Sequence, residues 1–315
     1  MKVIFSLVSI AFCVVLHAQK KETYYDYKWK PCDPLVARFY TTVEGTDSGW
    51  LRKNYYIGGL KLQMKALFSD SSCKIHNGYQ HFFYPNGTVA ETGRQVNNKN
   101  EGLCLNFHYN GMMADSAFFL KGRQVGTRLT WHPNGFPADS ISNINDSLQV
   151  SISWFDNGKP SSSGYLKNGK QHGKWQYFHR NGLPAALEHY ANGKFVSGEY
   201  YDEGNSLQPG TTFREAIKPS LKGGTDAWAK YLERNLRWPG GYKFTQGNMA
   251  VTTIGITINE EGGVEDVYVI TPFHPEFDQI ALQTIKDSPR WNPAIQHNRR
   301  VKFRFQQVVT FMQSD

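Results

Sequence analysis

Motifs for catalysis and metal binding are lacking in this chain of 315 residues. It has no Gly-x-Ser-x-Gly nucleophile motif, no His-Glu-x-x-His pair and no phosphate-binding loop. The acidic pairs Glu260-Glu261 and Glu265-Asp266 flank an expected turn, and we interpret them as solvated side chains. Cysteine is scarce, with four residues and no C-x-x-C spacing, which argues against a structural zinc site. We therefore expect a protein that is not an enzyme and carries no cofactor and no metal.

Long apolar runs are missing too, except at the N-terminus. Residues 1–18 combine Lys2, an apolar stretch over 3–16 and the small residue Ala18 before Gln19, which is the pattern of a secretory signal peptide. The stretch is shorter than the roughly 20 residues that a membrane-spanning helix needs. We expect a periplasmic or otherwise exported chain that is soluble after cleavage. An uncleaved membrane anchor is the alternative.

Cleavage would leave three cysteines, an odd number, in a compartment that permits disulfides. Cys32 and Cys73 lie outside the regular repeats described below, so we predict that they pair. Cys104 replaces a strand residue and is expected to be a small buried hydrophobe. The formal net charge is +8, but lysine and arginine are scattered rather than clustered. We expect no nucleic-acid partner and weak or no direct membrane contact.

Aromatic residues and glycine are abundant, and they recur in one short phrase. The phrase reads aromatic, then aromatic or histidine, then any residue, then Asn-Gly. Its five full copies end at glycines spaced 24, 24, 23 and 24 residues apart, and a degraded sixth copy ends 22 residues later at Gly204. A fixed period of this size indicates a stacked-repeat protein. The five glycines are Gly87, Gly111, Gly135, Gly158 and Gly182.

Each copy predicts a β-hairpin. In the fifth copy, residues 173–178 read as a strand, Asn181-Gly182 as a turn that needs positive φ, and 185–190 as the returning strand. One hairpin is marginally stable alone, so the copies are expected to stack. Other rings replace the histidines at the second position in the remaining copies, and we interpret these histidines as packing residues rather than metal ligands. They are His108, His132 and His179.

The amino-acid sequence of the repeats resembles a known family. Residues 165–175, YLKNGKQHGKW, followed by Phe178 and Asn181-Gly182, resemble the MORN repeat in its bacterial variant. The resemblance covers about residues 55–205 and implies a scaffold or interaction surface rather than a reaction. Some relatives carry an antitoxin label, so the resemblance also leaves open an inhibitor of a toxic enzyme.

The period ends after Gly204, and a different pattern follows. Residues 206–222 read as a linker. Helical periodicity follows at 226–236 and again at 275–288, where Pro289 stops it. Residues 249–258 and 264–270 alternate around a glycine-rich turn, which predicts a hairpin, and a last strand is expected at 301–311.

This order of elements and the sequences of several segments resemble the C-terminal domain of TonB. The residues that carry the likeness include Gly223-Gly224, the sequence NLRWP at 235–239, and SPRWNPA at 288–294. The resemblance implies a small α+β domain with a three-stranded antiparallel sheet. It also implies that the domain binds a short peptide of an outer-membrane transporter by adding it as a strand. By this analogy the partner-binding residues are Trp238, Pro239, Val301, Lys302, Phe303, Arg304, Phe305, Gln306 and Gln307.

Together these patterns predict a mainly β chain with an α+β end: a signal peptide (1–18), an extension with the first strands (19–54), MORN-like hairpins (55–205), a linker (206–222) and a TonB C-terminal-like domain (223–315). We expect an exported, non-catalytic envelope binding or scaffold protein. Its partner would be an envelope protein such as an outer-membrane TonB-dependent receptor. The alternative is a TonB-type energy transducer, although β-repeats stand where a transducer has a proline-rich spacer.

Overall fold

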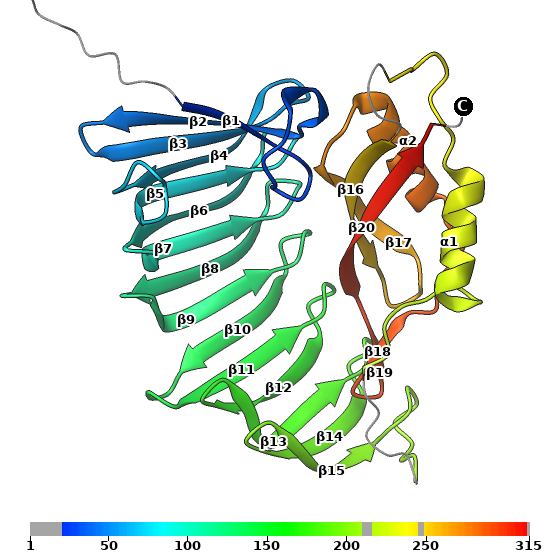
Figure 1. The fold of residues 1–315 in the computed structure, drawn as a ribbon. Helices are drawn as coiled ribbons and strands as arrows, with labels where there is room; N and C mark the ends of the chain where they lie inside the picture. The colour runs from blue at the N-terminus through cyan, green and yellow to red at the C-terminus, as the bar shows by residue number, and fades with distance from the viewer. Residues whose placement is uncertain (1–20, 210–215, 245–248, 314–315) are drawn as a thin grey trace, which may run out of the picture.

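The computed structural model describes residues 21–209, 216–244 and 249–313, and its dominant feature is one very long sheet (Figure 1). Fifteen strands follow each other in chain order, every neighbouring pair antiparallel. We call this the repeat sheet. Its strands are β1 (Lys21–Tyr25), β2 (Phe39–Thr46), β3 (Gly49–Tyr56), β4 (Lys61–Phe68), β5 (His76–Phe83), β6 (Val89–Val96), β7 (Lys99–Phe107), β8 (Met113–Leu120), β9 (Arg123–Trp131), β10 (Pro137–Asn143), β11 (Leu148–Trp154), β12 (Pro160–Lys167), β13 (Lys170–Phe178), β14 (Pro184–Ala191) and β15 (Lys194–Tyr200), with a short 3-10 helix, η1 (Pro34–Val36), after β1.

The Asn-Gly turns of the phrase join the strands of each hairpin at one end of the sheet, and we call them the phrase turns. Only the glycine takes positive φ, +92° at Gly87. Asn86 contributes its side chain instead: its Oδ1 accepts from the Thr88 amide at 3.0 Å, and its Nδ2 donates to the Tyr109 carbonyl at 3.0 Å. The two-residue turns at the other end differ, since both Asn192 and Gly193 have positive φ, as a type I′ turn requires.

The ring at the second position of the phrase forms a hydrogen bond to the next copy. The Tyr84 hydroxyl donates to the carbonyl of Phe107 at 2.9 Å, one period further along the chain. His108 Nε2 lies 2.7 Å from the Trp131 carbonyl, and His132 and His179 make the equivalent contacts one and three copies later. The histidines are therefore structural, and four of the five full copies hold a ring with a hydrogen-bond donor at this position.

The last part of the chain forms a small α+β module over residues 216–313. Three strands make the predicted antiparallel sheet; their order is β17-β16-β20, and the helices lie on one face. Its core is fully closed, since Ile254, Ile258 and Phe277 are each 0% exposed. The elements are α1 (Gly224–Asn235), β16 (Met249–Ile258), β17 (Val264–Thr271), α2 (Pro275–Lys286), β18 (Ala294–Gln296), β19 (Arg299–Val301) and β20 (Phe303–Met312).

Two expectations need correction. The last strand is not continuous over 301–311, because β19 ends at Val301 after pairing with β18, and β20 begins at Phe303. Cys32 and Cys73 are both free, so the predicted disulfide is absent. The loop of Cys32 follows β1, and the loop of Cys73 follows β4. These loops lie at opposite ends of strands that are eight residues long, which separates them by roughly 25 Å at about 3.3 Å per residue. A disulfide needs Cα atoms within about 7 Å.

The N-terminal segment predicted to be a signal peptide lies outside the described residues. Within the described ranges, no helix has the length and apolar character needed to cross a membrane.

Candidate binding sites

The C-terminal module packs against the phrase turns of the repeat sheet (Figure 1), and the third position of the phrase contacts it in the second, fourth and fifth copies. This position is the variable one. In the second copy it is Tyr109, whose ring stacks on Tyr268 of β17 with centroids 4.8 Å apart. In the fifth copy it is Arg180, whose Nη1 lies 3.1 Å from the Glu260 carboxylate. The residue that the sequence pattern left open is thus the one that faces the module.

The fourth copy places Asp156 at the third position, between two cations. Its Oδ2 lies 2.6 Å from Lys302 Nζ, and its other oxygen pairs with Arg180. Burial alone would raise the pKa of Asp156, but the hydrogen bonds from Lys302 and Arg180 outweigh it and hold the pKa below its usual value. Glu260 is only 5% exposed, and burial raises its pKa. Our interpretation of Glu260 as a solvated turn residue was therefore wrong.

The β18–β19 hairpin inserts its tip into the repeat sheet. His297 and Asn298 form a two-residue turn with φ of 50° and 59°. The His297 ring stacks on Tyr177 with centroids 3.8 Å apart, and its Nδ1 lies 2.8 Å from the carboxylate of Glu188, which is 0% exposed. Asn298 Nδ2 donates to the Tyr201 carbonyl at 2.9 Å. The sequence pattern did not predict this hairpin.

Arg299, at the base of that tip, replaces a hydrogen bond that the repeats make elsewhere. The second ring of the fourth copy is Phe155, which cannot donate to the carbonyl of Phe178 one period later. Arg299 Nη1 donates to this carbonyl at 3.1 Å, and its guanidinium lies 5.4 Å from the Phe155 ring centroid. Burial lowers the pKa of Arg299 to about 10, so the side chain stays charged at neutral pH. The module thus supplies the hydrogen-bond donor that the fourth copy of the repeat lacks.

A first candidate site is the groove along β20, which we call the β20 groove. β20 is an edge strand of its three-stranded sheet. The groove has a volume of about 360 Å³, and Trp228 of α1 closes it by donating from Nε1 to Gln307 Oε1 at 2.9 Å. Its lining is largely apolar and comes from the segment before α1, from α1, from Trp291 and from β20: Lys218, Pro219, Ser220, Leu221, Gly224, Thr225, Trp228, Trp291, Phe303, Arg304, Phe305 and Gln307.

The predicted partner-binding residues divide between several places. Phe303, Arg304, Phe305 and Gln307 line the β20 groove. Gln306 faces the cleft described below, Lys302 holds Asp156, and Val301 pairs with Ala294. Pro239 is buried, and Trp238 packs on Phe277, whose ring lies beside Phe311 near the far end of β20. The structure does not bring the Trp238-Pro239 corner to the groove.

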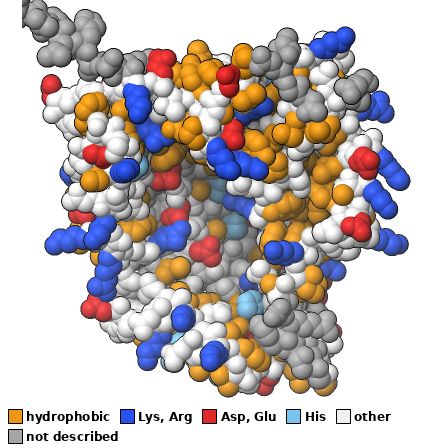
Figure 2. Space-filling view, viewed as in Figure 1, with side chains coloured by type: hydrophobic (Ala, Val, Ile, Leu, Met, Phe, Trp, Pro, Cys, Tyr) orange, Lys and Arg blue, Asp and Glu red, His pale blue; other side chains and the backbone are white. Residues whose placement is uncertain are grey.

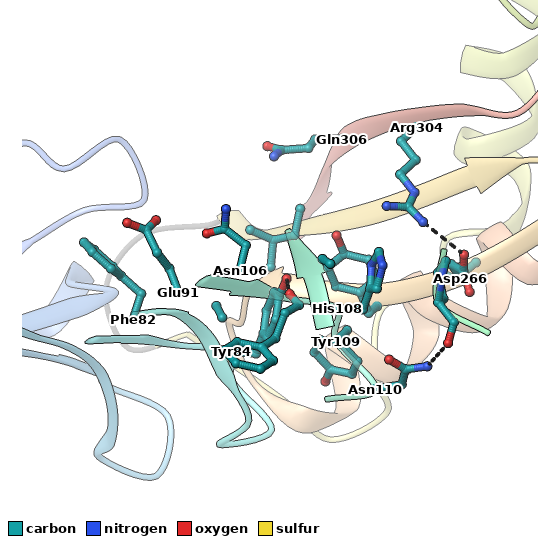
Figure 3. Close-up of a pocket in the computed structure, with 17 residues that line it drawn as sticks. Phe82, Tyr84, Glu91, Asn106, His108, Tyr109, Asn110, Asp266, Arg304 and Gln306 are labelled. Atoms are coloured by element: carbon teal, nitrogen blue, oxygen red, sulfur yellow. Dashed lines mark hydrogen bonds and ion pairs between the residues drawn. The ribbon is translucent and has the colours of Figure 1, made fainter. Parts of the chain in front are cut away.

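A second candidate site is the cleft between the repeat sheet and the module, which we call the inter-module cleft (Figure 3). Figure 2 shows this face of the molecule hollowed between the two parts, with acidic and histidine side chains inside. The cleft has a volume of about 770 Å³. Phe82, Glu91 and Asn106 form its floor as direct cross-strand neighbours on β5, β6 and β7. The module contributes Arg304 and Gln306 from β20.

Three titratable groups of the cleft already have partners. Glu91 Oε1 accepts from Gln80 Nε2 at 2.9 Å, and burial raises the pKa of Glu91. Arg304 lies 3.8 Å from Asp266. Burial lowers the pKa of His108, whose Nε2 is bound to a carbonyl. In the part of the chain that the structure describes, no group of three His, Cys, Asp or Glu side chains is arranged to hold a metal ion.

Comparison with known proteins gives one family match. Residues 245–312 match the family model of the Gram-negative bacterial TonB protein C-terminal. The match covers the elements from β16 to β20, α2 included, and begins after α1. No curated protein matches the chain. TonB C-terminal domains are non-catalytic, and they interact with envelope proteins such as outer-membrane receptors. The chain thus carries a TonB C-terminal domain at residues 245–312, preceded by a long sheet of β-hairpins.

Proposed function

We propose that this protein is an exported, non-catalytic binding and scaffold protein of the cell envelope. Its TonB C-terminal domain takes a segment of an envelope protein as an added strand on β20. The β20 groove is the observation that carries the proposal, since it combines an edge strand with apolar side-chain sites. An outer-membrane TonB-dependent receptor is the partner class that the family suggests.

The chemistry of the β20 groove suits strand addition. An edge strand offers backbone N–H and C=O groups, and these give affinity to any extended peptide. Side chains of β20 alternate between the core and the outside, as the exposure of Arg304, Gln306 and Val308 indicates. Apolar side chains of a partner would contact Trp228, Phe303 and Phe305.

The repeat sheet serves in this proposal as a MORN-like scaffold that fixes the position of the domain. The support is that its phrase turns contact the module through the third positions of the second, fourth and fifth copies, Tyr109, Asp156 and Arg180. Because these residues bind the protein's own module, the opposite side of the module remains available to a partner.

Photocrosslinking in envelope membranes tests the proposal. A photoreactive amino acid replaces Thr225, which is exposed and lines the β20 groove, and a matched control replaces Gln176, exposed on β13. We expect the Thr225 probe to crosslink an outer-membrane protein, and Phe305→Ala to weaken that product. Equal products from both probes, or none from Thr225, would contradict strand addition at β20.

A TonB-type energy transducer is the second candidate, favoured by the same family match. It would need the segment 3–16 as a retained membrane anchor. N-terminal sequencing of the mature protein separates the candidates, because a chain that begins at Gln19 has lost that anchor.

A further inference from the structure

The inter-module cleft has the size of a ligand site and is built by both parts of the chain. Its volume of about 770 Å³ lies within the roughly 300–1,000 Å³ typical of ligand pockets. Its floor is a face of the repeat sheet, whereas its opposite wall is formed by β17 and β20. It is distinct from the β20 groove, although Arg304 borders both.

Two side-chain amides point into the cleft with their hydrogen-bonding groups unused. Asn106 rises from the floor, and Gln306 lies across the space from it (Figure 3). Among the described residues, neither side chain has a hydrogen-bond partner. An apolar ligand would bury these amides without partners, which is unfavourable. The occupant must therefore offer donors and acceptors of its own.

The charges of the cleft disfavour an anion. Among the residues that the structure describes, Arg304 is the only lysine or arginine that lines it, and Asp266 lies 3.8 Å from its guanidinium. Glu91 adds a carboxyl group beside Asn106. A phosphate, sulfate or carboxylate would thus meet no uncompensated cation.

The cleft also disfavours a peptide bound by strand addition. Its floor presents side chains from the middle of three paired strands, so their backbone groups are already used in the sheet. What the floor offers is the flat ring of Phe82 beside a carboxyl and an amide, a combination that suits the C–H face and the hydroxyls of a sugar ring.

We propose that the inter-module cleft binds a neutral oligosaccharide. Aromatic rings contact the apolar faces of its sugars, while Glu91, Asn106 and Gln306 bind its hydroxyl groups. This goes beyond the proposed function, because it gives the protein a glycan site in addition to a protein site.

Isothermal titration of the full chain tests this proposal with chitohexaose, cellohexaose and maltohexaose as neutral probes and a galacturonic acid hexamer as an anionic one. We expect at least one neutral probe to bind and Gln306→Ala and Asn106→Ala each to weaken it at least tenfold. Gln306 is exposed, so its variant is expected to keep the wild-type melting temperature. The matched control Gln176→Ala, on the exposed face of β13, should bind like the wild type.

Three outcomes would overturn the glycan site: no neutral probe binds, only the anionic hexamer binds, or both cleft variants bind with unchanged affinity. Crosslinking from Thr225 in the β20 groove is measured separately, so a failure of the glycan site leaves the test of the protein site intact.

Discussion

The repeat sheet and the C-terminal module are both built from antiparallel strands, yet they bury their side chains differently. In the module, Ile254 and Phe277 are fully buried between one sheet and two helices. In the repeat sheet, apolar side chains remain exposed on one face, as Tyr79 at 67% and Leu103 at 52% show. The module is stabilised by a closed hydrophobic core, whereas the sheet depends more on hydrogen bonds between successive turns and on the module itself.

The largest expected effect comes from the core of the module. Phe277→Ala removes a ring that is 0% exposed, and large-to-small changes of this kind cost about 4 kcal/mol of unfolding free energy. The matched control is Phe118→Ala, because Phe118 is 45% exposed on β8 and its loss should cost under about 1 kcal/mol. Urea unfolding of both variants measures the difference. Equal losses would show that the two regions bury apolar surface alike.

A smaller loss is expected at the joint between the two regions. Arg299→Ala leaves the carbonyls of Ser161 and Phe178 without their donor, at a cost of about 3 kcal/mol. Hydrogen exchange should then speed up in the β18–β19 hairpin and in β12–β15. The adjacent Arg300 is exposed, so Arg300→Ala is the matched control and should leave exchange unchanged. Similar behaviour of the two variants would remove Arg299 from the joint.

Phe155→His sharpens the comparison further, because it gives the fourth copy the donor that other copies have. The new imidazole would compete with Arg299 for the Phe178 carbonyl, so the variant should weaken docking in the wild type and partly restore the sheet in Arg299→Ala. We expect a coupling of about 1.5 kcal/mol in a double-mutant cycle followed by urea unfolding. Additive effects would mean that the two side chains do not share one acceptor.

The smallest effect is expected within the ladder of rings. His132→Phe keeps a flat ring but removes the donor to the Trp154 carbonyl, so unfolding should become easier by about 1 kcal/mol. Phe155 shows that a phenyl ring fits this position in the neighbouring copy. A thermal melt identical to the wild type would restore the view that any ring is sufficient.

The sequence predicted those parts of the fold that depend on local patterns. The period of the phrase indicated hairpins and their turns, and alternation indicated β16 and β17. The sequence did not indicate the contacts between residues that are far apart in the chain. The third residue of the phrase carries no periodic signal, yet Tyr109, Asp156 and Arg180 face the module because the sheet brings the phrase turns to one edge. The pairing of Glu260 with Arg180 spans 80 residues, and nothing in the local turn around Glu260 indicates it.

The candidate sites divide in the same way. The TonB resemblance led to Phe303, Phe305 and Gln307 of the β20 groove, because strand order can be inferred from the order of elements. It did not lead to the inter-module cleft, since Asn106 and Gln306 are 200 positions apart in the numbering and meet only when the module packs on the sheet.

Whether the two regions form one docked unit is measured most directly by the distance between two spin labels on unnatural amino acids, which leave the cysteines untouched. One label replaces Gln176 on β13 and the other Lys286 at the end of α2, both exposed. Docking predicts one narrow distance distribution that survives Arg300→Ala and broadens in Arg299→Ala. A broad distribution in the wild type would contradict a module held by the phrase turns.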